Sequence, residues 1–296
     1  MKVFIAIASI LLLSCGNNEN RNGPQEEISV THDTTGPAGG TNIHNDSIGT
    51  KFLQGPAGTL FVDDGGRGGT PVIFLHSYGG STEQMQAQLS HLRKSRRAIA
   101  FDFRAHGQSA SHDSNYSVQS LSSDLAAVVN QLGLDSFILV GHSLGGSVAA
   151  LYAAANPSKV KAILLVGTPG KTPPAIADKV VSSLRTDQYE EVMSDYMNKL
   201  LEKAKPETRS VVMKGFEKLA RSTSISLIRA AFDYDPVPDL KKIEGEKLIV
   251  YSDLEDPVNS LGKQAPSVKK ILISGSSHWM QMDKKEEFNT ILDQFL

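Results

Sequence analysis

A serine between two glycines carries the clearest chemical signal in this sequence. The run GHSLG at residues 141–145 joins an apolar stretch, residues 137–140, to an alanine-rich stretch, residues 147–155. The first is typical of a short buried strand and the second of a close-packed helix. Glycines have no Cβ and therefore permit a sharp bend that holds the serine hydroxyl out at the end of the strand. We predict that Ser143 is a nucleophile and that the Leu144 N–H, unpaired at the start of the helix, faces the oxyanion.

A seryl hydroxyl is a poor nucleophile at neutral pH, so this prediction requires a base elsewhere in the chain. His278 is the candidate, because it lies in a loop rich in Gly and Ser at the end of an expected strand, residues 268–273. Loops at the carboxyl ends of strands are where open α/β sheets place their functional groups. The loop at residues 76–80 follows another apolar run, residues 71–75, and offers a second backbone N–H for the oxyanion.

The elements that must position these residues alternate along the chain, as in a mostly parallel sheet covered by helices. The expected strands cover residues 58–63, 71–75, 97–103, 137–140, 160–166, 247–251 and 268–273. A helix capped by Ser117 has apolar residues at helical spacing and stops at Gly133. His106, in the turn before it, is expected to be a structural residue bonded to the backbone. Asp283 and Glu286 are expected to cap a final helix.

Three segments, taken in order, resemble motifs of the α/β-hydrolase superfamily. Residues 76–79, HSYG, are similar to its HGxx oxyanion loop, with serine in place of the usual glycine. Residues 102–109, DFRAHGQS, are similar to its DxRGHGxS loop, with Ala105 in place of glycine. Residues 141–146 are similar to its nucleophile turn. The resemblance runs from about Gly58 to the end of the chain, apart from one insertion.

The resemblance implies an α/β-hydrolase fold, with a mostly parallel central sheet, helices on both faces and a helical cap. It implies that the N–H groups of Tyr78 and Leu144 are the oxyanion donors. The insertion, residues 171–242, corresponds to the cap, which leaves residues 51–170 and 243–296 as the core. Its helical stretches include residues 189–200, a second helix opened by Pro206 and Glu207, and a third short one holding Ile225, Ile228 and Phe232.

The resemblance further implies a catalytic triad in the chain order serine, acid, histidine. The acid of the superfamily lies in the loop after residues 247–251, and Asp256 is the prediction because an acid before proline is the common form. The acid usually falls three residues after a small residue, however, and that position is Glu255. The triad is therefore Ser143, His278 and one of these two carboxylates, with Asp256 preferred.

These residues predict a serine hydrolase that cleaves a small carboxylic ester or lactone through an acyl-enzyme intermediate. Serine at position 143 argues against dehalogenase and epoxide hydrolase chemistry, which requires an alkyl-enzyme ester. Two alternatives stay open. One is a carbon–carbon bond hydrolase of the same fold, because residues 278–281, HWMQ, are similar to the segment after the histidine in that subfamily. The other is a catalytically silent lipoprotein that binds a ligand in the capped pocket.

The composition favours a small-molecule partner. The net charge of −2, from 30 Lys and Arg against 32 Asp and Glu, gives no bias toward nucleic acid. The sequence has no HExxH, CxxC or GxxxxGK motif, so neither a metal nor a cofactor is expected.

The first residues have the pattern of an export signal. A short positive start precedes an apolar run, residues 3–13, and the run LLSC at residues 12–15 resembles the lipobox of bacterial lipoproteins. Residues 1–15 are therefore expected to be a lipoprotein signal peptide, with Cys15, the only cysteine, as the lipid attachment site for a palmitate-type anchor. Residues 16–50, rich in Asn, Gly and acidic residues, are expected to be a disordered tether. The domain would lie in the bacterial cell envelope, outside the cytoplasm and anchored to a membrane.

Overall fold

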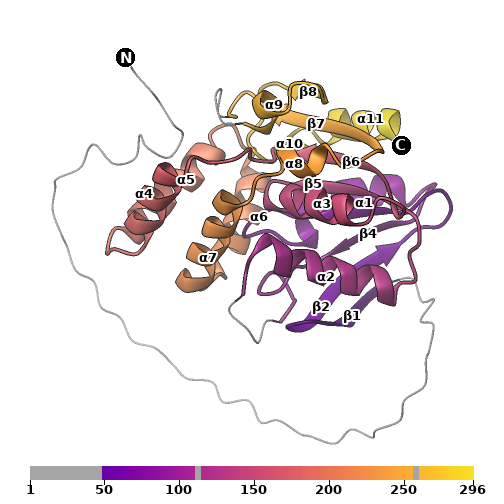
Figure 1. Cartoon of the computed structure of the whole chain (residues 1–296), viewed down its shortest axis with the longest axis horizontal. Helices are drawn as coiled ribbons and strands as arrows, with labels where there is room; N and C mark the ends of the chain where they lie inside the picture. Colours follow the sequence, from indigo (N-terminus) through magenta and orange to yellow (C-terminus); the bar gives the residue numbers. More distant parts are fainter. Residues whose placement is uncertain (1–48, 111–114, 256–259) are drawn as a thin grey trace, which may run out of the picture.

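The computed structural model describes residues 49–110, 115–255 and 260–296 (Figure 1). Cys15, the signal segment, nearly all of the expected tether and Asp256 lie outside the described residues. No helix within the described part of the chain is long and apolar enough to cross a membrane.

An eight-stranded sheet forms the centre of the molecule, in the order β1-β2-β4-β3-β5-β6-β7-β8. The strands are β1 (Gly49–Gly55), β2 (Gly58–Gly65), β3 (Val72–Leu75), β4 (Ala98–Phe101), β5 (Phe137–His142), β6 (Val160–Val166), β7 (Glu246–Ser252) and β8 (Lys269–Ile273). The pairs β1/β2 and β2/β4 are antiparallel and all other neighbours are parallel. Strands β3 to β6 are almost wholly buried, because helices cover both faces. The predicted fold class is confirmed.

Helices form a layer on each face of the sheet, and a separate group, α4 to α7, lies beyond one end of the strands (Figure 1). They are η2 (Thr82–Met85), α1 (Gln86–Leu92), α2 (Val118–Gln131), α3 (Leu144–Ala155), α4 (Pro174–Leu184), α5 (Tyr189–Leu200), α6 (Pro206–Glu217), α7 (Arg221–Asp233), α8 (Val237–Leu240), α9 (Leu261–Gln264), α10 (Met280–Asp283) and α11 (Lys285–Phe295). One apolar core joins α2, α3 and α8 to the sheet, and a second joins α1, α10 and α11 to the opposite face.

Strand β1 is an element that the sequence pattern did not reveal. It begins at Gly49, inside the stretch expected as tether, and forms a hairpin with β2 in which Gly55 pairs with Gly58. Its residues are mostly exposed or half-buried, and Phe52 is 57% exposed. An edge strand of this kind has no continuous apolar run, so only its pairing with β2 identifies it.

The insertion, which we call the cap (residues 171–242), holds α4 to α8 and has apolar cores of its own. One core is formed by α4, α5 and α7 and another by α5 and α6 with Trp279 of the main domain. Helix α4 was not expected, although its buried residues Ala177, Val180, Val181 and Leu184 have helical spacing. Pro206 occupies the first turn of α6, as predicted.

The end of the chain differs from the expected capping pattern. Helix α11 starts after Lys284, whose side chain makes no capping hydrogen bond. The expectation that Asp283 caps this helix is wrong, because its carboxylate accepts hydrogen bonds from the N–H and hydroxyl of Ser277 and from the N–H of Lys205. Glu286 lies inside the first turn instead of at the cap position. Asp283 thus ties the loop before His278 to the cap.

Candidate active site

Ser143 lies on the bend between β5 and α3 in a strained backbone conformation, with φ 53° and ψ −116°. Neighbouring glycines make the bend possible. A Cβ on Gly141 would lie 2.5 Å from the carbonyl oxygen of Gly145, and a Cβ on Gly145 would lie 2.4 Å from that of Leu75. Both contacts are with backbone, which has no room to move away. Only glycine fits at positions 141 and 145, and the bend they allow holds the serine hydroxyl at the carboxyl end of β5.

The predicted residues that the structure describes meet in one cavity of about 180 Å³ between the core and the cap. Ser143, Leu144, Tyr78 and His278 all line it, together with Glu255. The rest of the lining is largely apolar and includes Pro169, Ile176, Leu200, Leu227, Ile228, Ala231, Phe232 and Leu254. Asp256, the preferred acid, lies outside the described residues.

Two backbone N–H groups in this cavity are available to a ligand. The Leu144 N–H is the first of α3, so it has no partner within the helix and lies at the positive end of the helix dipole. The Tyr78 N–H lies in the loop after β3. Neither N–H donates a hydrogen bond to any described residue. Both residues line the cavity beside Ser143, which is the arrangement that an oxyanion requires.

Buried histidines hold the loop that carries Tyr78. The Gly79 N–H donates to Nε2 of His106 at 3.2 Å, so Nδ1 of His106 carries the proton and donates to the Arg104 carbonyl at 2.9 Å. Burial lowers the pKa of His106 to about 3, which keeps the ring neutral and Nε2 free to accept. His106 is thus bonded to backbone, as the sequence suggested, and one of its partners is in the loop that carries Tyr78. His76, beside it, accepts from the Phe103 N–H in the same way.

The backbone of His278 is fixed from two sides. Its N–H donates to the Leu200 carbonyl of the cap at 3.0 Å, and its carbonyl accepts from Nε2 of His142 at 2.9 Å. Nδ1 of His142 in turn faces the side-chain amide of Gln281 at 3.2 Å, which sets the His142 tautomer. Burial lowers the pKa of His278 to about 4, so the imidazole is neutral and able to take a proton at pH 7. No role for His142 was predicted from the sequence. The one sequence feature that could have indicated a role is its position next to Ser143.

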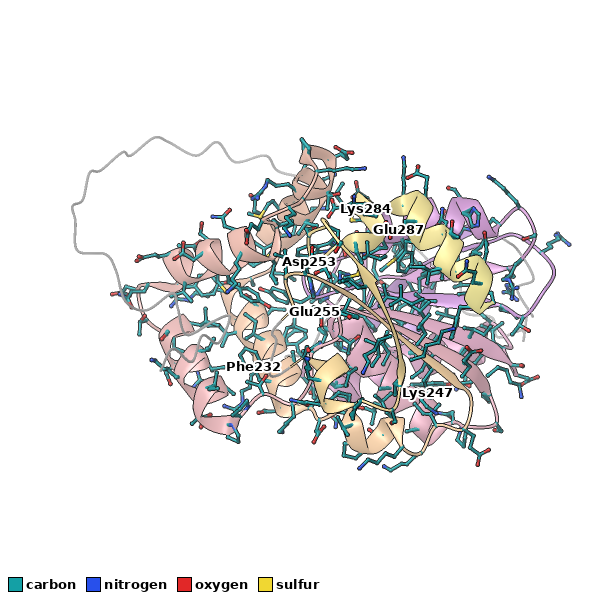
Figure 2. All side chains as sticks on the ribbon, turned by 90° about the horizontal axis from the view of Figure 1, so that it is seen from above. Phe232, Lys247, Asp253, Glu255, Lys284 and Glu287 are labelled. Carbon is teal, nitrogen blue, oxygen red and sulfur yellow. The ribbon has the colours of Figure 1, made fainter. Side chains whose placement is uncertain are left out.

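Glu255 and the imidazole of His278 both lie near Gly167. A Cβ on Gly167 would be 2.8 Å from Cε1 and 3.0 Å from Nδ1 of His278, and 3.5 Å from Oε1 of Glu255. That oxygen is buried and has no hydrogen-bond partner among the described residues. Burial raises the pKa of Glu255 to about 8. Figure 2 shows Glu255 where the end of β7 meets the cap.

Asp253, the other described carboxylate of this loop, does not reach the cavity. It accepts hydrogen bonds from the Ser274 hydroxyl at 2.9 Å and the Gly275 N–H at 2.8 Å, and pairs with Lys203 at 3.2 Å (Figure 2). These exposed contacts tie the loop after β7 to the loop after β8 and to the cap.

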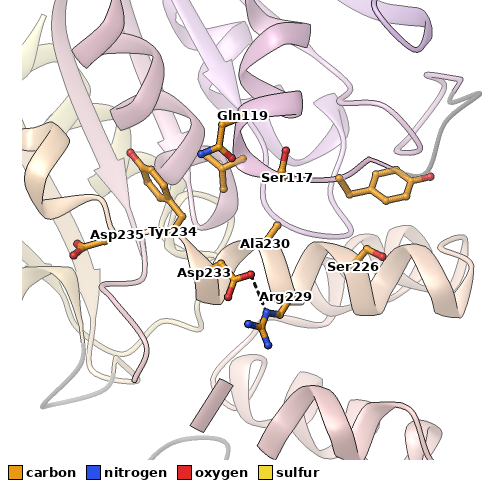
Figure 3. Close-up of a pocket in the computed structure, with 10 residues that line it drawn as sticks. Ser117, Gln119, Ser226, Arg229, Ala230, Asp233, Tyr234 and Asp235 are labelled. Carbon is orange, nitrogen blue, oxygen red and sulfur yellow. Dashed lines mark hydrogen bonds and ion pairs between the residues drawn. The ribbon is translucent and has the colours of Figure 1, made fainter. Parts of the chain in front are cut away.

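A second hollow, of about 330 Å³, lies between the start of α2 and helix α7 (Figure 3). Its one cationic side chain is Arg229, which pairs with Asp233 at 2.8 Å and with Asp178 at 2.5 Å. The positive charge is therefore already matched, and the hollow contains no nucleophile with a base beside it. Nowhere in the described ranges do three His, Cys, Asp or Glu side chains gather as metal ligands would.

Comparison with known proteins agrees with this geometry. A family model described as the alpha/beta hydrolase fold matches residues 70–213. A non-heme chloroperoxidase from Kitasatospora aureofaciens is 28% identical over 80% of this chain and 95% of that protein. An sn-1-specific diacylglycerol lipase from Mus musculus is 24% identical over 76% of this chain and 80% of the lipase. The solved structure of an enol-lactonase from Burkholderia xenovorans matches with a TM-score of 0.73 at 16% identity, covering 83% of this chain and 99% of that one.

Proposed function

We propose that this protein is a serine hydrolase that cleaves a small carboxylic ester or lactone. The chain belongs to the α/β-hydrolase superfamily and is an enzyme of that type. One observation carries the proposal: Ser143, a neutral buried imidazole and two available N–H groups line the same cavity. The sn-1-specific diacylglycerol lipase among its relatives is named for ester hydrolysis, which supports the same reaction class.

The reaction follows from these groups. Nε2 of His278 takes the proton of Ser143 as the hydroxyl oxygen attacks the acyl carbon, and the carbonyl oxygen becomes an oxyanion. The N–H groups of Tyr78 and Leu144 donate to that oxyanion, and each is worth about 3 to 4 kcal/mol in the transition state. The imidazolium then gives its proton to the leaving alcohol, and water, activated by the same imidazole, releases the acid from Ser143.

A carboxylate beside Nδ1 stabilises the imidazolium and holds the ring in place. Glu255 is the described carboxyl that lines the cavity together with His278, and both side chains lie near Gly167. Asp256 was preferred from the sequence and is its neighbour in the chain, so the acid is one of two adjacent residues. On the contacts of the described residues, we assign the role to Glu255.

The size and lining of the cavity favour a small, uncharged acyl group. A cavity of about 150 Å³ lined by Leu, Ile and Phe holds a benzene molecule, and this one is only slightly larger at about 180 Å³. Its described lining contains no Lys or Arg to match a second carboxylate on the substrate.

Burst kinetics test this function. We expect p-nitrophenyl acetate and butyrate to give one equivalent of p-nitrophenol per site in a fast phase, followed by slower turnover. Ser143→Ala should abolish both phases and labelling by a fluorophosphonate. Ser147→Ala is the matched control, because this serine lies one turn along α3 and its hydroxyl makes no hydrogen bond to any residue that the structure describes. Wild-type protein that neither hydrolyses esters nor reacts with fluorophosphonate would show that the cavity only binds a ligand.

We also propose that the protein is a lipoprotein of the bacterial cell envelope, modified on Cys15. The apolar run followed by LLSC supports this. Radiolabelled palmitate should be incorporated by the wild type and not by Cys15→Ser. Equal labelling of the two proteins, or recovery of the wild type in the cytoplasmic fraction, would refute the anchor.

A further inference from the structure

The side chain of Tyr78 is held by the cap instead of by the core. Its hydroxyl is 2.5 Å from the hydroxyl of Ser224 on α7. The same Ser224 oxygen accepts a hydrogen bond from the hydroxyl of Tyr189, the first residue of α5, at 2.7 Å. Ser224 is fully buried, with 0% of its surface exposed. Three hydroxyls from the oxyanion loop and two cap helices therefore satisfy one another in a place that water does not reach.

The surroundings make this contact specific. Tyr78 and Tyr189 pack in the apolar core of the cap, together with residues of α4, α5 and α7. The guanidinium of Arg221 lies 4.8 Å from the centre of the Tyr189 ring and helps to fix it. Within this group Ser224 is the polar side chain that joins Tyr78 to the cap, so its loss leaves both phenols without their partner.

The backbone next to Tyr78 is also in contact with the cap. Gly215 of α6 lies so close that a Cβ on it would be 2.4 Å from the carbonyl oxygen of Gly79. Gly79 has φ 65°, and a Cβ on it would be 3.3 Å from Cα of Phe216. The rings of Tyr78 and Phe216 meet edge to face, with centroids 6.0 Å apart. Helix α6 therefore lies directly on the loop, while α7 holds the Tyr78 side chain.

The Tyr78 N–H belongs to the peptide that joins Ser77 to Tyr78, and the carbonyl of that peptide accepts from the Gly80 N–H at 2.9 Å and from Nδ1 of His76 at 2.7 Å. The contacts with the cap lie directly after this peptide.

On the core side of the loop that carries Tyr78, His106 accepts from the Gly79 N–H. On its cap side, Gly215 limits the Gly79 carbonyl and Ser224 anchors the phenol. We propose that Ser224 is a positioning residue: through the Tyr78 hydroxyl, it aims the Tyr78 N–H at the oxyanion, so the oxyanion hole is complete only when the cap is in place. This proposal rests on the serine hydrolase function proposed above.

The test is Ser224→Ala, with Ser226→Ala as its matched control. Ser226 is on the same helix, and its exposed hydroxyl donates to the Ser222 carbonyl one turn back, its one partner among the described residues. Active sites are counted by labelling with a fluorophosphonate to completion so that kcat refers to folded protein, because slower acylation would itself shrink the p-nitrophenol burst. We expect Ser224→Ala to lower kcat for p-nitrophenyl acetate about ten- to a hundredfold with KM little changed, because the oxyanion exists only in the transition state. Ser226→Ala should match the wild type.

A double-mutant comparison separates positioning from general damage. Tyr78→Phe removes the hydroxyl and keeps the backbone N–H, so it should lower kcat as Ser224→Ala does, and the double variant should lose no more than either single one. If Ser224→Ala folds poorly, Tyr189→Phe removes the other partner and should shift kcat in the same direction. A raised KM with unchanged kcat, or additive losses in the double variant, would overturn the proposal while leaving the hydrolase function intact. A wild type without any Ser143-dependent burst would overturn both.

Discussion

Replacing Glu255 by glutamine tests which of two adjacent carboxylates, Glu255 or Asp256, is the acid of the triad. Its first expected effect is on the free energy of unfolding. The pKa of Glu255 is raised by burial to about 8, against an ordinary value of 4.5. Between these pH values the unfolded chain has lost the proton and the folded chain keeps it, so the free energy of unfolding falls as pH rises. The full loss by pH 9 is about 5 kcal/mol. Glutamine has no proton to lose, so the Glu255→Gln variant should become more stable than the wild type as pH rises from 5 to 9.

The same titration should appear in the rate. His278, with a pKa of about 4, is a neutral base at every pH above 5 and does not set the pH profile. If Glu255 stabilises the imidazolium, it must be ionised to do so, and kcat/KM of the wild type should rise with pH through about 8. Glu255→Gln should flatten this rise and lower kcat about 10⁴-fold, as loss of the acid does in other serine triads.

Urea unfolding at pH 5.5, 7 and 9 measures the first effect, and hydrolysis of p-nitrophenyl butyrate from pH 5 to 9.5 measures the second. Asp256→Asn is the matched control, since it removes the next carboxylate along the chain. A wild-type pH profile in Glu255→Gln, together with a 10⁴-fold loss in Asp256→Asn, would refute our assignment and make Asp256 the acid. Equal urea midpoints for wild type and Glu255→Gln at pH 9 would show that the Glu255 carboxyl ionises without cost.

Three further predictions concern the backbone. Ala105 adopts φ 59°, so Ala105→Gly should raise the free energy of unfolding by about 1 kcal/mol, measured in urea; a loss of stability would contradict the strain we infer. Ser143→Gly and Ser143→Ala should both be inactive, but the glycine variant should be the more stable by about 1 kcal/mol, because φ is 53°; calorimetry showing the reverse order would refute this. Gly145→Ala places a Cβ 2.4 Å from the Leu75 carbonyl and should cost about 3 kcal/mol, so a near-native melting temperature would show that α3 can shift.

The sequence predicted the core of the fold because the relevant information is local. Strands buried on both faces appear as continuous apolar runs, and the glycines around Ser143 mark a bend at a fixed distance from it. The sequence also showed alanine at position 105, where the superfamily motif has glycine. In the structure Ala105 adopts the left-handed backbone conformation that the motif's glycine would adopt. The sequence could then predict that Leu144, Tyr78 and His278 lie close together, because each follows a strand and parallel strands end on the same side of the sheet.

What the sequence did not show depends on partners that are distant along the chain. Asp283 has the spacing of a helix cap, but one of its partners is the N–H of Lys205 in the cap, and no local pattern encodes that contact. Ser224 looked like any polar helix residue, because its two partners are a loop tyrosine and a tyrosine on another helix. Strand β1 can be identified only from its pairing with β2, because its mostly exposed residues form no continuous apolar run.

These long-range contacts have a common consequence for the cap. The backbone of Ser143 is held by the sheet and by α3: its N–H donates to the Val166 carbonyl, and its carbonyl accepts from the N–H groups of Gly146 and Ser147. The other working parts each carry a bond to the cap: the His278 N–H to the Leu200 carbonyl and the Tyr78 hydroxyl to Ser224. On the proposed mechanism, the cap therefore helps to position both the base and the oxyanion donors. Because catalysis requires these groups to keep their geometry to well under an ångström, we expect variants that loosen the cap to lose activity even where Ser143 and the sheet are unchanged.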